Sequence, residues 1–443
     1  MTIHHHFSYR RIQTGNHTLR AVAAIACLIV FQAAATQAIS ATSDTTVVQR
    51  FGALKTAGNK IVDQNGNPVV LRGMSLYWSQ WKGQFYNTNC VQWLRNDWKC
   101  SVVRASMAVE MGGYLTNALN EKTKIKNVIN ACIAAGIYVI VDWHDHHAQW
   151  HTPQAIAFFE EIARLYHDKP NIIYEIYNEP LQVSWADSVK PYADTLARRI
   201  RAIDPNNLII VGSPTWSQDV DIAAGNPLTY SNIAYTLHFY AATHKQSLRN
   251  KAAVALAKGA ALFVSEFGTT EASGTGKIDS AETELWMKFM NDNQLSWCNW
   301  SVADLSETSA ALKPGASGDG GWPLSEISIS GLWIRNKIRT ENAAIVSGIR
   351  SVGEAPLNFQ LDQNYPNPFN PSTTIGFQVP EDGLVTIDIF DALGRKVDTL
   401  LNEFMHRGIH HIRWTPSHVS SGVFFCQLKA GSFVDMRRMI VLK

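Results

Sequence analysis

Residues 171–180 read Asn-Ile-Ile-Tyr-Glu-Ile-Tyr-Asn-Glu-Pro, an apolar strand candidate that runs into Glu179 and stops at a proline. A second apolar run, 261–266, ends in the same way at Glu266 and is followed by Phe-Gly. Carboxylates are rarely buried unless they are paired or take part in chemistry. Two glutamates where strands end are typical of the acid/base and nucleophile pair of a glycosidase. The alternative is that each one only marks a solvent-facing strand end.

Strand and helix candidates alternate from about residue 60 to 345. The short apolar runs that predict strands are 69–71, 101–106, 138–142, 171–177, 208–212, 233–239, 261–266 and 296–301. The amphipathic stretches that predict helices include 122–135, 156–166, 189–203 and 281–291. Strands that are apolar throughout and alternate with helices indicate a parallel sheet covered on its outer side. Eight such units favour an α/β fold, the (β/α)8 TIM barrel, over an open doubly wound sheet. No glycine-rich phosphate loop follows any strand candidate.

A barrel of this kind carries its chemistry at the C-terminal ends of its strands. Six of the eight predicted ends bear polar or aromatic residues: Arg104, His144, Asn178 with Glu179, His238 with Tyr240, Glu266 and Trp300. A barrel without a site would not require such residues at one mouth.

Composition and charge exclude several classes of function. The chain has 443 residues, a formal charge of +2 and only 17% charged residues. This balance gives no basis for binding nucleic acid or an anionic membrane. Arg10, Arg11 and Arg20 precede an apolar run at 21–35 that is too short to span a bilayer, which predicts a signal peptide over residues 1–38.

The remaining chain is expected to form a catalytic barrel (41–345), a linker (346–358) and a small all-β sandwich (359–443). The last segment opens on the proline-rich turn 364–371. Short alternating runs predict its strands at 373–379, 384–390, 396–401, 409–414, 422–428 and 436–442. Cys90 and Cys100 are interpreted as packed thiols, because a helix between them would hold their Cα atoms too far apart for a disulfide.

The barrel resembles glycoside hydrolase family 5, and within it the bacterial endo-β-1,4-glucanases. The matching motifs lie one per strand along nearly the whole barrel: 71–75 (LRGMS), 102–104 (VVR), 141–144 (VDWH), 177–180 (YNEP), 237–240 (LHFY), 264–268 (VSEFG) and 297–301 (WCNWS). One such motif would be weak evidence, but seven in order are specific.

The resemblance implies that Glu179 is the acid/base and Glu266 the nucleophile of a retaining enzyme without a cofactor or metal. In such an enzyme one carboxyl group protonates the leaving oxygen and the other, ionised, attacks C1. Arg104 would favour the ionised form of Glu266, and the charge on Glu266 would raise the proton affinity of Glu179. Asn178 would bind the 2-hydroxyl of the sugar at the cleavage point.

The same resemblance implies further substrate contacts. His144, His238 and Tyr240 would position the sugar ring and Glu266, and Trp300 would form the apolar floor of that subsite. Trp216 would stack on the leaving-group side, and Trp81 further out on the other side.

Departures from the family pattern affect only the distal subsites. Cellulases of this kind commonly carry a lysine soon after the tryptophan of the eighth strand, but this chain has Leu305 in that region. They also often carry an aromatic residue after the arginine of the second strand, where this chain has Ala108. Mannan, lichenan or xyloglucan therefore stay open as substrates beside cellulose. A non-catalytic polysaccharide-binding protein also stays open, although the intact glutamate pair argues against it.

A metal site is a second alternative. Residues 142–147 read Asp-Trp-His-Asp-His-His, which resembles a metal cluster, but such sites need further His and Asp on other strands, and the later strand ends carry Glu, Tyr and Trp. His146 and His147 are interpreted as loop residues that face solvent. At least one of Trp93 and Trp98 is expected to pack in the core.

The tail resembles the C-terminal sorting domain of the type IX secretion system of Bacteroidetes-like bacteria. The matching stretches are 365–373, 388–395, 421–424 and 437–443. The resemblance implies export through the periplasm to the outer surface or the medium, with the secretion machinery as partner. A carbohydrate-binding module is the alternative, with Trp414, Phe424 and Phe425 as stacking candidates, although their alternation suits a sandwich core better. We expect a monomer that has β-glucan as its substrate and no transmembrane segment.

Overall fold

The computed structural model describes residues 45–346, 359–380, 383–405, 408–416 and 419–442. The predicted signal peptide and all but the first residue of the predicted linker lie outside these ranges. The chain divides into two compact units, Met1–Ile349 and Arg350–Lys443. In the described part, no helix is long and apolar enough to cross a membrane.

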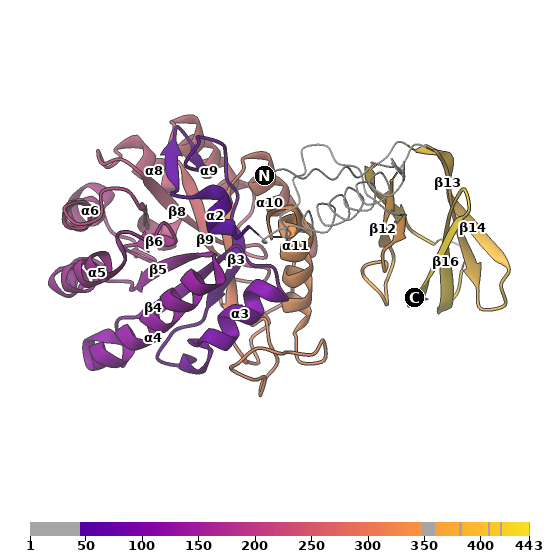
Figure 1. Cartoon of the computed structure of the whole chain (residues 1–443), viewed down its shortest axis with the longest axis horizontal. Coiled ribbons are helices and arrows are strands. Elements are labelled where there is room, and N and C mark those ends of the chain that lie inside the picture. The colour runs from indigo at the N-terminus through magenta and orange to yellow at the C-terminus, as the bar shows by residue number, and fades with distance from the viewer. Residues whose placement is uncertain (1–44, 347–358, 381–382, 406–407, 417–418, 443) are drawn as a thin grey trace, which may run out of the picture. The chain divides into compact units, whose positions relative to one another are not determined.

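The first unit is a closed barrel of eight parallel strands, as predicted (Figure 1). The strands are β3 (Arg72–Leu76), β4 (Val102–Ala108), β5 (Tyr138–His144), β6 (Ile172–Glu175), β7 (Leu208–Val211), β8 (Ile233–Tyr240), β9 (Leu262–Gly268) and β10 (Ser296–Val302). They pair in chain order, and β10 closes the barrel on β3. All strand ends of one polarity therefore meet at one mouth.

Helices surround the barrel (Figure 1). They are α3 (Thr88–Asn96), α4 (Tyr114–Ala135), α5 (Thr152–Tyr166), α6 (Lys190–Arg201), α7 (Pro214–Ser217), α8 (Val220–Gly225), α9 (Gln246–Ala257), α10 (Ser280–Asp292) and α11 (Ile329–Val346), preceded by the short elements α2 (Val47–Phe51), β1 (Lys55–Ala57) and β2 (Lys60–Val62). Local sequence sets their ends. Asp279 caps α10 by accepting a hydrogen bond from the Glu282 amide, and Gly136 ends α4 in the left-handed conformation at φ 65°.

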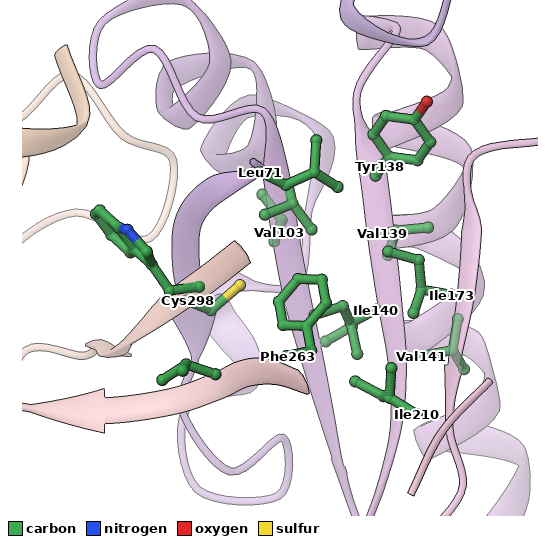
Figure 2. Close-up of a cluster of buried hydrophobic side chains, with 14 of the residues drawn as sticks. Leu71, Val103, Tyr138, Val139, Ile140, Val141, Ile173, Ile210, Phe263 and Cys298 are labelled. Carbon is green, nitrogen blue, oxygen red and sulfur yellow. The ribbon is translucent and has the colours of Figure 1, made fainter. Parts of the chain in front are cut away.

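The barrel core consists of the apolar side chains that made the strands recognisable. Figure 2 shows part of this core, in which strand residues such as Val139, Ile140 and Ile173 pack together. Residues on both faces of β5 are buried because one face fills the barrel and the other lies under the helices.

Two predicted strand boundaries are wrong in ways that matter for the site. The first strand is β3, whereas the run at 69–71 precedes it, because the amide of Val69 bonds to Ile61 instead. The fourth strand, β6, ends at Glu175 rather than at residue 177. Glu179 therefore belongs to the loop after the strand, while Glu266 lies inside β9.

The second unit consists of two antiparallel sheets. One contains β11 (Gln360–Leu361), β12 (Thr373–Val379) and β15 (Gly408–Trp414), and the other contains β14 (Lys396–Met405), β13 (Gly383–Asp391), β16 (Gly422–Ala430) and β17 (Phe433–Val441). Their inner faces share one apolar core, which confirms the sandwich, although β11 was not predicted. Trp414 and Phe424 are buried in this core, as their alternation indicated.

The cysteines and two tryptophans behave largely as predicted. Cys90 and Cys100 are buried free thiols, as are the other cysteines in the described part of the chain. Trp98 is fully buried in the core, but it lies beyond the end of α3, and Trp93 is only partly buried.

Candidate active site

Arg104 occupies the centre of the barrel mouth. It lies inside β4 with no exposed surface, and each guanidinium nitrogen contacts a different acidic side chain. The Nε–Glu175 Oε2 distance is 2.7 Å, Nη1–Glu266 Oε2 is 2.9 Å and Nη2–Asp142 Oδ2 is 2.9 Å. Nη2 also donates to Asn178 Oδ1 at 2.6 Å. One buried cation thus connects strands β4, β5, β6 and β9.

Burial shifts the pKa of two of the carboxylates around Arg104, Asp142 and Glu175. Burial raises the pKa of Asp142 to about 7 even though Arg104 favours its ionised form. Burial raises the pKa of Glu175 as well, again against the effect of Arg104. Burial disfavours the charge of the guanidinium, but the three carboxylates outweigh it and raise the pKa of Arg104 well above the ordinary value, so the group stays charged.

Glu266 is held by two donors. Arg104 Nη1 donates to one carboxylate oxygen at 2.9 Å, and the Tyr240 hydroxyl donates to the other at 2.8 Å. Burial raises the pKa of Tyr240 well above its ordinary value, so this phenol keeps its proton and remains a donor. The Glu266 side chain is only 6% exposed. Its carboxylate is therefore fixed in one orientation at the end of β9.

Glu179 has a different environment. Its side chain is 14% exposed, and Oε1 lies 2.9 Å from His238 Nδ1. Burial raises its pKa to about 7, with Asp142 and Glu175 adding to the rise and His146 and Arg104 opposing it. Burial, rather than the charge of Glu266 that the sequence analysis invoked, is the largest cause. One polar atom from each of Glu179, His238 and Glu266 lies within 4.8 Å of the others.

Two more predicted residues form one wall of the site. His144 Nδ1 lies 2.6 Å from Asp142 Oδ2, and burial lowers the pKa of His144 well below its ordinary value. The neutral ring therefore donates from Nδ1 to Asp142. The Trp300 ring stacks parallel to His144, with a centroid distance of 5.3 Å and an angle of 4°. Trp300 reaches this position at a cis peptide bond to Ser301.

Asn178 presents an unused donor. Its Oδ1 accepts from Arg104, whereas its buried Nδ2 has no hydrogen-bond partner among the described residues. An amide whose oxygen is engaged in this way directs its nitrogen as a donor, and a buried donor without a partner is costly. The arrangement suits a ligand hydroxyl.

Trp81 lies on the loop after β3 and Trp216 lies in the short element α7 after β7, with 50% and 40% of their surface exposed. Trp81 packs against Trp78 at a centroid distance of 5.3 Å. Trp216 lies in a left-handed segment, with φ values of 59°, 54° and 57° at residues 215, 216 and 217. Non-glycine residues hold such conformations only where surrounding contacts impose them.

Those contacts come from the loop that carries Glu179. The Trp216 amide donates to the Pro180 carbonyl at 2.9 Å, and the Ser217 hydroxyl donates to the Asn178 carbonyl at 2.7 Å. The structure therefore joins the predicted site residues into one contact network. Trp81 is joined to it through Trp78, whose ring packs edge-on against His144 at a centroid distance of 4.1 Å. Trp216 is joined through the hydrogen bond from its amide to the Pro180 carbonyl. Trp81 and Trp216 lie at the same end of the barrel.

Sequence reasoning missed several members of this network. Glu175 and Ser265 were not singled out, and Asp142 was considered only as a metal ligand. A charged residue within the apolar run 171–177 was the available signal for Glu175. The side chain of His146 is 26% exposed, in line with its assignment to a solvent-facing loop, but it also contacts the site, because its Nδ1 lies 3.2 Å from the Glu179 carbonyl oxygen and 3.8 Å from Glu179 Oε2.

A histidine and carboxylate group lies beside this site. Polar atoms of Glu110, Asp145 and His151 lie within 4.8 Å of one another. His151 Nδ1 is 2.7 Å from Asp145 Oδ2, and His147, which also stacks on Trp150, pairs with Glu110 at 3.2 Å. Hydrogen bonds among these residues account for the group without an ion.

The geometry supports a defined kind of chemistry. It holds two carboxyl groups close together, one with a pKa near 7 and the other bound by two donors. Such a pair can supply a proton at one atom and an electron pair at another. Exposed indoles on two sides can bind flat apolar faces of a ligand.

Comparisons with known proteins match both units of the chain. The cellulase model (glycosyl hydrolase family 5) matches residues 62–306, and a secretion system C-terminal sorting domain matches residues 363–442. An endoglucanase of Clostridium saccharobutylicum is 48% identical over 66% of this chain and 66% of its own length. Endoglucanase Z of Dickeya dadantii is 51% identical over 56% of this chain and 61% of its own length. The chain thus spans less than two thirds of these curated relatives.

Solved structures are similar over the barrel. A structure from Cytophaga hutchinsonii is 52% identical, with a TM-score of 0.68, and the match covers 69% of this chain and 100% of that chain. The catalytic domain of Thermobifida fusca endoglucanase Cel5A is 36% identical, with a TM-score of 0.64, over 66% of this chain and 99% of that chain.

The central role of Arg104 can be tested by Arg104→Lys. Lysine keeps the charge but cannot reach three carboxylates and Asn178 at once, so buried acidic groups lose partners. We expect the free energy of unfolding to fall by about 3 kcal/mol. Arg164→Lys, at a surface pair with Glu160, is the matched control and should change it by less than about 1 kcal/mol. Denaturant unfolding followed by tryptophan fluorescence measures both, and equal effects would contradict the assignment.

Proposed function

The chain belongs to glycosyl hydrolase family 5, and from this premise we propose that it is a secreted retaining endo-β-1,4-glucanase. The observation that carries the proposal is the unequal carboxyl pair. Oxygens of Glu179 and Glu266 lie within 4.8 Å of each other, which fits the spacing of about 5 to 5.5 Å in retaining enzymes rather than the wider spacing of inverting ones.

In the first step Glu266 attacks C1 of the sugar. Arg104 and Tyr240 hold its carboxylate so that the attacking electron pair is aimed before the substrate arrives. Glu179 donates its proton to the glycosidic oxygen as the C1–O bond breaks. A pKa near 7 keeps this carboxyl group protonated in mildly acidic to neutral solution.

In the second step Glu179, now ionised, takes a proton from water, and the water oxygen displaces Glu266 from C1. Two inversions give net retention. Asn178 offers its free Nδ2 to the 2-hydroxyl of the sugar, and Trp300 supports the apolar face of the ring. His144, oriented by Asp142, and His238 with Tyr240 complete the wall of this subsite.

The polymer preference rests on the relatives and on the exposed indoles. The curated relatives above are named endoglucanases, and Trp81 and Trp216 lie exposed at the barrel mouth, where the flat faces of β-linked glucose units can stack.

Purified full-length enzyme should cleave carboxymethylcellulose and mixed-linkage β-glucan faster than mannan or xyloglucan. Internal cleavage lowers viscosity early, while few reducing ends have formed. Viscometry and reducing-end assays on the four polymers measure both properties. Faster hydrolysis of mannan, or release of reducing ends without an early drop in viscosity, would contradict the proposed substrate and mode of action.

The roles of the two glutamates are separable by azide rescue. Glu266→Ala should lose turnover by about 10⁴-fold or more, because no other group can attack C1. Glu179→Ala should keep the first step for aryl glycosides whose leaving group needs no proton, and azide should then give a β-glycosyl azide. Rescue of Glu266→Ala should give the α-azide by direct displacement. Proton NMR of the products distinguishes the two, and swapped anomers would reverse the roles.

The tail is proposed to direct secretion. The sorting-domain match covers residues 363–442. Trp414 and Phe424, two of the three residues considered above as stacking candidates, are buried and therefore unavailable to a polysaccharide. The proposed route crosses the periplasm before the type IX machinery recognises the tail. The final location would be the medium or the outer cell surface.

Deletion of residues 359–443 should leave activity of the purified barrel nearly unchanged, because every site residue precedes residue 347. In the host cell the truncated enzyme should accumulate in the periplasm. Full-length Glu266→Ala is the control and should be exported normally. Fractionation and immunoblotting measure location. Continued export with loss of binding to insoluble cellulose would instead indicate a binding module.

A further inference from the structure

The three most exposed tryptophans in the described part of the chain are Trp81, Trp150 and Trp216. Two of them are assigned above to the proposed active site, whereas Trp150, with 68% of its surface exposed, is not. Trp150 lies in the short element η2 (Ala148–Trp150), on the loop between β5 and α5. The tail contains one tryptophan, Trp414, which is buried. Trp150 is therefore an accessible indole that the proposed active site does not use.

The indole of Trp150 is held in a fixed orientation. It stacks on the His147 ring with a centroid distance of 4.5 Å and an angle of 8°. His147 is fixed in turn, because its Nδ1 lies 3.2 Å from Glu110 Oε2 and its amide donates to Asp145 Oδ1 at 2.8 Å. Since one face of the indole lies against His147, its exposed surface lies on the other face and the edges. A ring that is already fixed loses little freedom when a ligand stacks on it.

The loop that carries Trp150 is anchored to the loop that carries Glu179. The Tyr177 hydroxyl donates to the His146 carbonyl at 2.9 Å and also contacts Gln149 Oε1. The C-terminal end of β5, from which the loop starts, lies at the mouth of the barrel. Trp150 is therefore held on the same rim as the proposed active site.

The surroundings of Trp150 suit a sugar better than a protein. The residues next to it in the chain, or in contact with its stacking partner, are polar: Gln149, His151 and Glu110. A glucose unit has a flat apolar face with hydroxyl groups at its edge, and it matches an indole bordered by carboxylate and imidazole groups. A stable protein interface buries about 800 Å² on each partner, far more than one indole supplies.

We propose that Trp150, with His147 and Glu110, forms a binding platform for a β-linked glucan chain outside the proposed active site. Among the described residues, no hydrogen bond, ion pair or ring contact joins Trp150 or His147 to Glu179, Glu266 or the other two exposed tryptophans. The identity of the polymer rests on the proposed function. Two sites that hold one polymer surface bind it more strongly together than either site alone.

Binding can be measured in full-length Glu266→Ala, which should hold the polymer without cleaving it. In this background Trp150→Ala should weaken binding to insoluble cellulose about fivefold, because the indole contact is lost. The affinity for cellohexaose, a short chain that occupies the active site alone, should stay unchanged. Depletion isotherms on cellulose and calorimetry with cellohexaose measure the two affinities.

Two further variants serve as controls in the same background. Trp150→Tyr keeps a flat ring and should retain most of the binding to cellulose. Phe404→Ala removes a comparably exposed aromatic side chain from β14 of the tail, 64% exposed, and should leave binding unchanged. The proposal would be overturned by unweakened binding in Trp150→Ala, by equal weakening in Phe404→Ala or by a parallel loss of affinity for cellohexaose. A loss in Trp150→Tyr as large as in Trp150→Ala would exclude stacking.

Oxidative footprinting tests the platform without a substitution at Trp150. In full-length Glu266→Ala, hydroxyl radicals should oxidise Trp150 both in the free protein and with cellohexaose bound, while cellohexaose protects Trp81 and Trp216. Insoluble cellulose should protect all three, as measured by mass spectrometry. Unprotected Trp150 on cellulose, or protection of Trp150 by cellohexaose, would overturn the proposal. If the wild type cleaved no glucan while cellulose protected Trp150, the proposed function alone would fail.

Discussion

The buried guanidinium of Arg104 is the constraint on which the site depends. A single positive charge without exposed surface faces three carboxylates from three different strands. Each of those groups lost its hydration when the barrel closed, and the loss is offset only while all the contacts are made together. Burial raises the pKa values of Asp142 and Glu175, which shows that their contacts with Arg104 do not fully offset the lost hydration. Closure of the barrel and assembly of the site are therefore one event.

Each of the three carboxylates then fixes the orientation of a different part of the proposed site. Glu266 is itself the proposed nucleophile. Asp142 orients His144, on which Trp300 stacks, and Glu175 orients His238 through Ser265. Side chains that are proposed to contact the sugar are thus positioned by side chains behind them, and this arrangement gives rotamer precision that a surface loop alone would not provide.

The sequence predicted the architecture because the barrel strands are apolar on both faces, and apolar runs are visible without a structure. It also located Glu179 and Glu266, since charges are rare at such positions. It did not reveal Ser265 or the placement of His146, because a serine in a strand and a histidine in a loop have many ordinary explanations. It misplaced the end of β6 because the backbone stays extended beyond Glu175, where Ile176 still bonds to Ile210.

That misplaced boundary explains why the two glutamates behave differently. Glu266 lies within β9, where neighbouring strands fix its backbone, and a nucleophile gains from such rigidity. Glu179 lies beyond β6 and keeps 14% of its side chain exposed, which suits its proposed exchange of a proton with the leaving group and then with water. The loop that carries it is held on its far side by the left-handed segment at Trp216. The contacts of that segment thus hold Glu179, the proposed acid, and Trp216, the proposed leaving-group contact, in a fixed relation to each other.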